Sequence, residues 1–193
     1  MGAARPRSGR PGIQPGLGRS TLITHTLSHQ VAEQIEKARQ LYHRLVIVAG
    51  PPRSGKTSAL RDLHHERGWP LVNVNLALSE KLLELTDKQR ALRVARMVDD
   101  IVQEQAGDTI LLDNIEMLFH PDLKQDPLRL LQSLSRNRTI VATWRGGQLG
   151  TPLTYAAPDH PEFRRFEEPE ALIVFSGGVP GNSGATSAQE HSA

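Results

Sequence analysis

The segment from Gly50 to Thr57 reads Gly-Pro-Pro-Arg-Ser-Gly-Lys-Thr and fits the pattern G-x-x-x-x-G-K-[ST], which suits phosphate binding. Glycines let successive backbone N–H groups point at phosphate oxygens, and the positive end of a following helix adds to the attraction. Lys56 would bridge the terminal phosphates, and the Thr57 hydroxyl would bind Mg²⁺. A glycine-rich turn with an exposed lysine is the alternative. The predicted nucleotide-binding residues are Gly50, Pro51, Pro52, Arg53, Ser54, Gly55, Lys56, Thr57 and Ser58.

Two carboxylates are candidates for the chemistry beside the phosphates. Asp113 follows the short apolar run 110–112, and at a strand end it could hold the Mg²⁺ that Thr57 also contacts. Many P-loop ATPases have glutamate directly after this aspartate, but here the next residue is Asn114, an amide that cannot accept a proton. Glu116 is therefore the predicted base or water-positioning residue. The alternatives are a surface carboxylate at a strand end for Asp113 and a helix-start charge for Glu116.

Thr143 ends another apolar run, 139–143. If the strand of this run lies between the phosphate-loop strand and the strand of Asp113, the Thr143 hydroxyl can contact the γ-phosphate or the attacking water. We therefore predict a sensor role for Thr143. The alternative is that threonine is simply a favourable strand residue.

Two adjacent arginines, Arg164 and Arg165, precede the last apolar run. A guanidinium that reaches a neighbouring subunit's γ-phosphate would stabilise transition-state charge, and we predict this role for one of them. Arg136 and Arg138, just before the run that ends in Thr143, compete for it. A solvated basic loop without a catalytic role is the remaining alternative.

Composition indicates one folded domain with unstructured ends. The chain has 193 residues, no cysteine and a formal net charge of +2. Residues 1–20 carry four arginines and no acidic residue, and they are rich in Gly and Pro. We predict a disordered basic tail over 1–20, a domain over 21–175 and a second disordered tail over 176–193.

No apolar run approaches the roughly 18 residues of a membrane span. The basic tail could touch nucleic acid or be solvated, and we predict a cytoplasmic protein without membrane contact.

Apolar runs alternate with amphipathic segments, a pattern typical of a parallel sheet covered by helices on both faces. We predict an α/β fold with nucleotide at the carboxyl ends of the strands. The predicted strands are 45–49, 71–76, 110–113, 139–143 and 171–175. The first predicted helix begins near Ser28, and the second covers 56–67 with Gly68 as its stop. The third covers 79–85, and the fourth begins at the capping box Thr86/Gln89 and ends at Gly107. The fifth extends from Asp126 to about Asn137. The segment rich in Gly and Pro between Trp144 and the last strand is predicted to be a long loop.

Five stretches together resemble a known family. They are GPPRSGKT, VNVNLALSEKLLELTDKQRALR, ILLDNIEMLF, LKQDPLRLLQSLSRNRTIVATW and LTYAAPDHPEFRRF. Over roughly residues 25–175 the chain resembles BrxF, the small P-loop component of the third type of BREX phage-defence system. The resemblance implies ATP binding through Gly50, Gly55, Lys56, Thr57 and Asp113. It also implies a larger ATPase, a DNA methyltransferase and a phosphatase-like protein as partners.

The motif order also resembles the core of AAA+ ATPases, which normally continues into a helical lid for which this sequence has no segment. We therefore expect an AAA+-like P-loop core without a C-terminal lid. The leading hypothesis is a component that binds and hydrolyses ATP with Mg²⁺ in a multi-protein defence complex that acts on DNA. We expect any contact of this protein with DNA to be indirect. Self-association of subunits is one way in which its sites could be completed. The alternatives are a nucleotide-dependent adapter without turnover and a small-molecule kinase.

Overall fold

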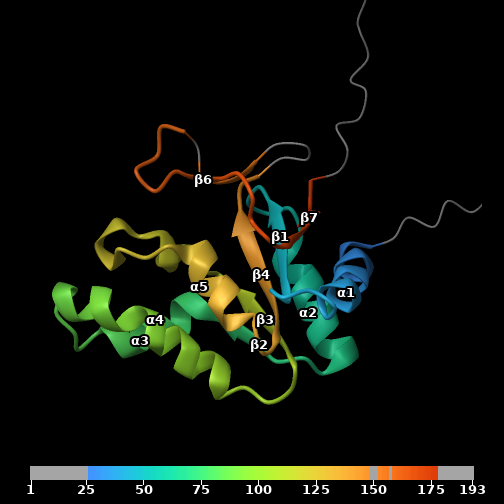
Figure 1. Cartoon of the computed structure of the whole chain (residues 1–193), viewed down its shortest axis with the longest axis horizontal. Coiled ribbons are helices and arrows are strands. Elements are labelled where there is room, and N and C mark those ends of the chain that lie inside the picture. Colours follow the sequence, from blue (N-terminus) through green and yellow to red (C-terminus); the bar gives the residue numbers. More distant parts are fainter. Residues whose placement is uncertain (1–25, 148–151, 157, 178–193) are drawn as a thin grey trace, which may run out of the picture.

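Five short strands form one parallel sheet in the computed structural model, which describes residues 26–147, 152–156 and 158–177. The spatial order is β2-β3-β4-β1-β7, and every neighbouring pair is parallel. The strands are β1 (Leu45–Gly50), β2 (Leu71–Asn73), β3 (Thr109–Asp113), β4 (Thr139–Arg145) and β7 (Leu172–Phe175). The predicted α/β class is thus confirmed, and β4 lies between β1 and β3 as the Thr143 hypothesis requires (Figure 1).

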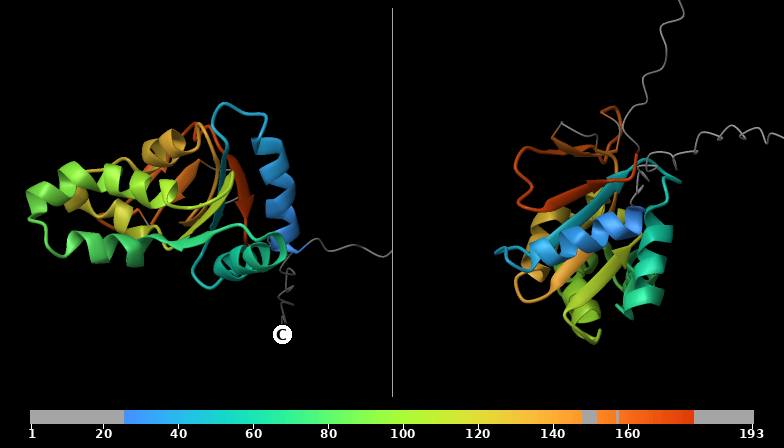
Figure 2. Two further views of the ribbon diagram at one scale, coloured as in Figure 1. Left: turned by 90° about the horizontal axis from the view of Figure 1, so that it is seen from below. Right: turned by 90° about the vertical axis from the view of Figure 1, so that its right-hand side faces the viewer.

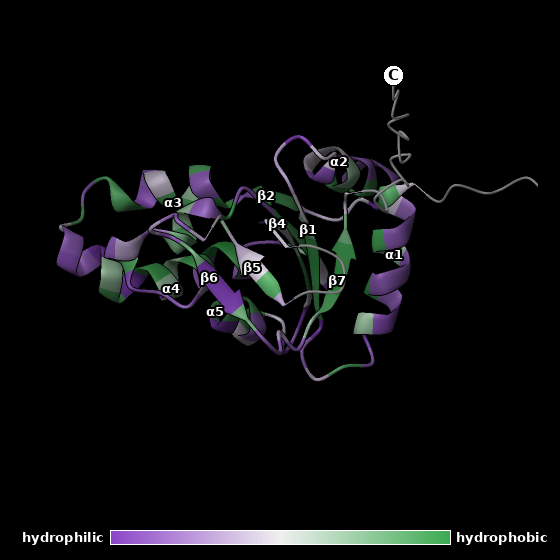
Figure 3. Ribbon diagram, turned by 90° about the horizontal axis from the view of Figure 1, so that it is seen from above, coloured by the Kyte–Doolittle hydropathy of each residue, from purple (hydrophilic) through white to green (hydrophobic). Residues whose placement is uncertain are grey.

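Helices cover both faces of the sheet because side chains along each strand point alternately to the two faces. Val46 and Val48 of β1 pack with α1 (Leu27–Ala38) and α2 (Lys56–Arg67). Leu45 and Ile47 belong to the larger core on the other face. Figures 1 and 2 show α1 and α2 on one side of the sheet. The elements of the other side are α3 (Val74–Leu82), α4 (Asp87–Gln103), α5 (Pro127–Leu134) and the short 3₁₀ turns η1 (Glu116–Phe119) and η2 (Pro121–Leu123). In Figure 3 the hydrophobic strands lie between helices with mixed faces.

Local capping signals fix several helix ends as predicted. The Thr86 hydroxyl accepts the Gln89 N–H, and the Gln89 side chain accepts the Thr86 N–H, which is a complete capping box at the start of α4. Gly68 ends α2 with φ 68°, a left-handed conformation that glycine adopts without steric cost. These ends were predictable because they depend only on residues within one turn.

The predicted strand 71–76 is wrong in its second half. β2 ends at Asn73, whose side chain accepts the Leu76 N–H and thereby starts α3 at Val74. Val74 and Leu78 lie four residues apart on the buried face of that helix. The apolar residues of this segment therefore follow the spacing of a helix and not the alternation of apolar and polar residues that is typical of a strand. The helix predicted over 79–85 consequently begins earlier and ends at Leu82. α5 ends at Leu134 rather than near 137.

A small antiparallel sheet occupies part of the segment that was predicted to be a loop. β5 (Leu153–Tyr155) pairs with β6 (Arg164–Phe166). Trp144 anchors this sheet, because its indole Nε1 donates a 2.9 Å hydrogen bond to the Thr154 carbonyl and its ring contacts Phe166. The Tyr155 ring stacks on Phe119 of η1 at a centroid distance of 3.3 Å. Strands of three residues give too weak a periodic signal to be predicted.

The predicted tails 1–20 and 176–193 lie outside the described residues, apart from Ser176 and Gly177. The part of the chain that the structure describes contains no helix long and apolar enough to cross a membrane.

Thr86→Ala should remove the capping box of α4 and lower the free energy of unfolding by about 1 kcal/mol. For a domain of this size the melting temperature should fall by about 2–4 °C in a thermal melt followed by circular dichroism. Lys88→Ala, an exposed first-turn residue of the same helix, is the control and should change the melting temperature little. Equal melting temperatures for Thr86→Ala and Lys88→Ala would contradict the capping role.

Candidate nucleotide-binding site

The phosphate loop leaves the carboxyl end of β1 at Gly50 and enters α2 at Lys56. Gly50 has φ 156° and Gly55 has φ 87°, and a Cβ atom on Gly50 would lie 2.0 Å from the Ser176 hydroxyl oxygen. Both glycines are therefore required by the backbone path. The loop encloses a hollow of about 240 Å³ lined by Arg53, Ser54, Gly55, Lys56, Thr57 and Ser58. The predicted motif residues thus lie together at the start of a helix, where anion binding is favoured.

The Lys56 ammonium group folds back onto its own loop. Its Nζ donates hydrogen bonds to the carbonyls of Gly50 (2.8 Å) and Pro51 (2.6 Å) and to the Ser54 hydroxyl (3.2 Å). Burial lowers the pKa of Lys56 below its ordinary value, while the carboxylates of Glu116 and Asp113 partly oppose that shift. A bound phosphate would replace the carbonyl acceptors with charged oxygens, to which the ammonium group binds more strongly.

Asp113 forms the polar centre of the site. Its Oδ1 accepts a 2.8 Å hydrogen bond from the Thr143 hydroxyl and a 3.3 Å bond from the Thr57 hydroxyl. The residue is only 5% exposed. The carboxylate and the Thr57 hydroxyl are the hard oxygen ligands that Mg²⁺ prefers. The described residues contain no cluster of three or more His, Cys, Asp or Glu that could hold a metal ion.

Asn114, the departure from the usual glutamate, has a role in the backbone turn. It adopts φ 54°, a left-handed conformation that asparagine tolerates better than most residues. Its N–H donates to the Thr143 hydroxyl (3.3 Å), and its carbonyl accepts the Asn75 N–H (2.9 Å). The chain therefore turns sharply after Asp113, which brings η1 and Glu116 back toward the carboxyl edge of the sheet.

Glu116 is held by a residue that the sequence analysis missed. The Asn75 side-chain amide donates a 3.1 Å hydrogen bond to Glu116 Oε2, and its Oδ1 accepts the Met117 N–H at 2.9 Å. Asn75 fell within the predicted strand 71–76, but it lies in the first turn of α3. Of the two carboxylates that partly oppose the lowering of the Lys56 pKa, Glu116 has the larger effect. The structure thus places Glu116 near the phosphate loop with a fixed orientation.

Two further residues of the site, Arg145 and Ser176, were not predicted from the sequence. Arg145 pairs with Gly50 in the register of β4 and β1, it is exposed, and its charge contributes to lowering the Lys56 pKa. It lies two residues after Thr143, on the same face of the strand, and this spacing could have identified it. The Ser176 hydroxyl shares a hydrogen bond with Ser54 and donates to the Ala49 carbonyl, so the end of β7 contacts the loop.

The arginines proposed for a neighbouring site lie on β6. Arg164 Nη1 donates to the Phe163 carbonyl (2.9 Å), and Arg165 forms a 2.8 Å ion pair with Glu167. Among the described residues neither guanidinium hydrogen bonds to the phosphate loop, and a role toward a second subunit stays a prediction.

The competing pair of arginines, Arg136 and Arg138, lies away from this chain's own phosphate loop. Arg136 and Arg138 precede β4, at the sheet edge opposite the phosphate loop. Arg138 Nη1 is occupied by the carbonyls of Val102 (3.0 Å) and Gln105 (2.7 Å). A role of Arg136 or Arg138 toward a neighbouring subunit's phosphate therefore stays a prediction, as it does for Arg164 and Arg165.

Comparison with solved structures finds distant similarity. The chain is similar to PCH-2 from C. elegans, with 16% sequence identity, a TM-score of 0.40, and coverage of 78% of this chain and 40% of that one. It is also similar to AMPPCP-bound DnaA from Aquifex aeolicus, with 16% identity, a TM-score of 0.41, and coverage of 82% of this chain and 51% of that one. The chain thus spans about half or less of these structures. No protein-family model and no curated protein matches it. Its assignment as an α/β P-loop NTPase core depends on the sheet order and the Gly50–Thr57 loop described above.

Proposed function

We propose that this protein binds ATP with Mg²⁺ and hydrolyses it in the cytoplasm, as a component of a BREX-type phage-defence complex that acts on DNA. The observation that carries the ATP proposal is the hydrogen-bonded cluster of Thr57, Asp113 and Thr143 beside the phosphate-loop hollow. The BREX context is supported by the sequence resemblance. The implied partners are a larger ATPase, a DNA methyltransferase and a phosphatase-like protein.

The residues of the site have distinct tasks in this proposed mechanism. The loop N–H groups and Lys56 bind the phosphate oxygens, and Thr57 and Asp113 hold Mg²⁺, which neutralises phosphate charge when bound. Glu116, oriented by Asn75, accepts a proton from the attacking water or positions it. Thr143 contacts Asp113 and is placed to exchange that hydrogen bond for one to the water or the γ-phosphate.

A nucleotide-dependent adapter is the second candidate, and one observation favours it. The Glu116 carboxylate already accepts a hydrogen bond from Asn75, so part of its capacity to accept a hydrogen bond from an attacking water is used. ATP would then control assembly with the partners while turnover stays negligible. A neighbouring subunit that contributes Arg164 or Arg165 would favour turnover instead, because such an arginine stabilises transition-state charge.

Lys56→Ala should weaken the binding of Mg-ATP by about 10- to 100-fold, because the loop loses its charged hydrogen-bond donor. Isothermal titration calorimetry measures this directly. Lys81→Ala is the matched control, since Lys81 lies on α3 and pairs with Glu104 at 3.6 Å. Undiminished binding by Lys56→Ala would remove the basis of the nucleotide proposal.

Glu116→Gln should keep ATP affinity and reduce turnover by about 10²- to 10⁴-fold if Glu116 acts as the base. Asn75→Ala should reduce turnover by a smaller factor, because Glu116 keeps its carboxylate but loses its orientation. A phosphate-release assay with and without the partner proteins separates the two candidates. Turnover in the wild type that survives Glu116→Gln would contradict the assigned base, and no turnover under any condition would favour the adapter.

Arg145→Ala should weaken ATP binding severalfold, and the difference from wild type should shrink at high salt because the arginine is exposed. Fluorescent-ATP titrations at low and high ionic strength test this. Arg129→Ala is the control, since Arg129 is an exposed arginine of α5 that pairs with Asp126. The same affinity for Arg145→Ala and Arg129→Ala at low salt would show that Arg145 does not act on the phosphates.

A further inference from the structure

Arg53, at a variable position of the phosphate loop, has a backbone conformation that its side chain disfavours. Its φ is 63°, in the left-handed region where a Cβ atom crowds the following carbonyl oxygen. Glycine would adopt this conformation without steric cost, and the asparagine at position 114 tolerates it because its short side chain can hydrogen bond locally. Backbone strain of this kind clusters at functional sites, where the surrounding structure holds it. The strain at Arg53 therefore points to a task for its side chain.

The two residues before Arg53 leave their part of the loop without backbone donors. Pro51 and Pro52 have no N–H group, so the backbone donors that follow Gly50 begin only at Arg53. The arginine side chain carries five N–H donors in a planar fork that matches the geometry of phosphate oxygens. Arg53 can thus supply charged donors to the part of the loop in which the prolines supply none.

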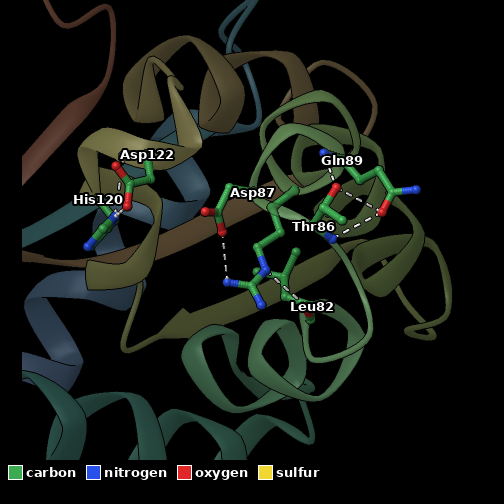
Figure 4. A network of polar contacts seen from close by, with 7 residues as sticks. Leu82, Thr86, Asp87, Gln89, His120 and Asp122 are labelled. Carbon is green, nitrogen blue, oxygen red and sulfur yellow. Dashed lines mark hydrogen bonds and ion pairs between the residues drawn. The ribbon is translucent and has the colours of Figure 1, made fainter.

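The Arg53 guanidinium is available to a ligand. The residue is exposed and lines the hollow of about 240 Å³ in the phosphate loop. Within the described part of the chain it forms no ion pair or side-chain hydrogen bond. Arg90 shows the contrast, because its guanidinium donates to the Leu82 carbonyl at 3.1 Å and to Asp87 at 3.4 Å, two residues labelled in Figure 4.

Lys56, the other cation of the loop, is occupied in the same sense as Arg90. Its Nζ donates three hydrogen bonds to acceptors of the loop itself. A phosphate must therefore displace those acceptors before it binds Lys56, whereas it can meet Arg53 without breaking a contact of the protein.

We propose that the Arg53 guanidinium binds a phosphate oxygen of the nucleotide as a second cation beside Lys56, and that this contact is the reason for a strained residue in the loop. The inference rests on the proposed binding of ATP and names a further residue of that site. Arg53 then has two opposite effects. It destabilises the loop without nucleotide, because of its φ, and it strengthens the binding of phosphate, because of its charge.

Three substitutions separate the strain from the charge. Arg53→Gly removes both, Arg53→Ala removes the charge and keeps the strain, and Arg53→Lys keeps both. In thermal melts without nucleotide, Arg53→Gly should raise the melting temperature by about 1–3 °C, because glycine relieves the strain. Arg53→Ala and Arg53→Lys should melt close to the wild type.

Isothermal titration calorimetry with Mg-ATP measures the effect of the charge. Arg53→Gly and Arg53→Ala should each weaken binding by about three- to tenfold at low salt, and Arg53→Lys should lose less than either. The difference from the wild type should shrink at high salt, because the guanidinium is exposed. Arg67→Ala is the control of equal charge change. Arg67 is an exposed arginine in the last turn of α2, at the end of that helix away from the phosphate loop, and its variant should bind as the wild type does.

The remaining outcomes overturn the inference, and they differ from failure of the ATP proposal. If Lys56→Ala weakens binding while Arg53→Ala binds as the wild type does, the nucleotide site stands and the role of Arg53 is wrong. Equal weakening by Arg67→Ala and Arg53→Ala would show an effect of net charge rather than a contact. A melting temperature of Arg53→Gly that does not rise would remove the strain from the argument. A wild type that does not bind Mg-ATP would overturn both proposals.

Discussion

The buried carboxylate of Asp113 is the constraint on which the arrangement of the site depends. A charged group that is 5% exposed has lost most of its water and must be stabilised by hydrogen-bond donors of the protein. Thr57 supplies one from the helix that follows β1, and Thr143 supplies another from β4. The donors thus tie three neighbouring strands together at their carboxyl ends, with the phosphate loop beside them.

The sequence predicted this centre because its signals are local. Gly50–Thr57 has a fixed spacing, and Asp113 and Thr143 each end an apolar run. The carboxyl ends of parallel strands meet at one edge, so two strand-terminal residues can be placed together without knowledge of the side-chain contacts. The α/β class and the capping box of α4 followed from the same kind of local pattern, whereas the place of β4 between β1 and β3 was a condition of the Thr143 hypothesis that the sheet order meets.

The residues that were missed depend on contacts between distant segments. Asn75 reaches Glu116 across 41 positions, and its assignment was wrong because three strand residues and a helix start resemble a longer alternating strand. The small sheet depends on Trp144, whose indole needs a buried acceptor that only the folded chain supplies. The direction of β4 shows that Arg136 and Arg138 lie away from this chain's own phosphate loop, which the order of residues alone does not show.

The stacking of Tyr155 on Phe119 connects the antiparallel β5–β6 ribbon to the short turn that also carries Glu116. Phe119 belongs to the same short turn as Glu116, whereas the ring of Tyr155 belongs to the ribbon. A displacement of the ribbon would therefore be transmitted through the two stacked aromatic rings to the turn that carries the proposed base. The stacked rings include no phosphate-loop residue, so this contact would carry a displacement of the ribbon directly to the turn of Glu116.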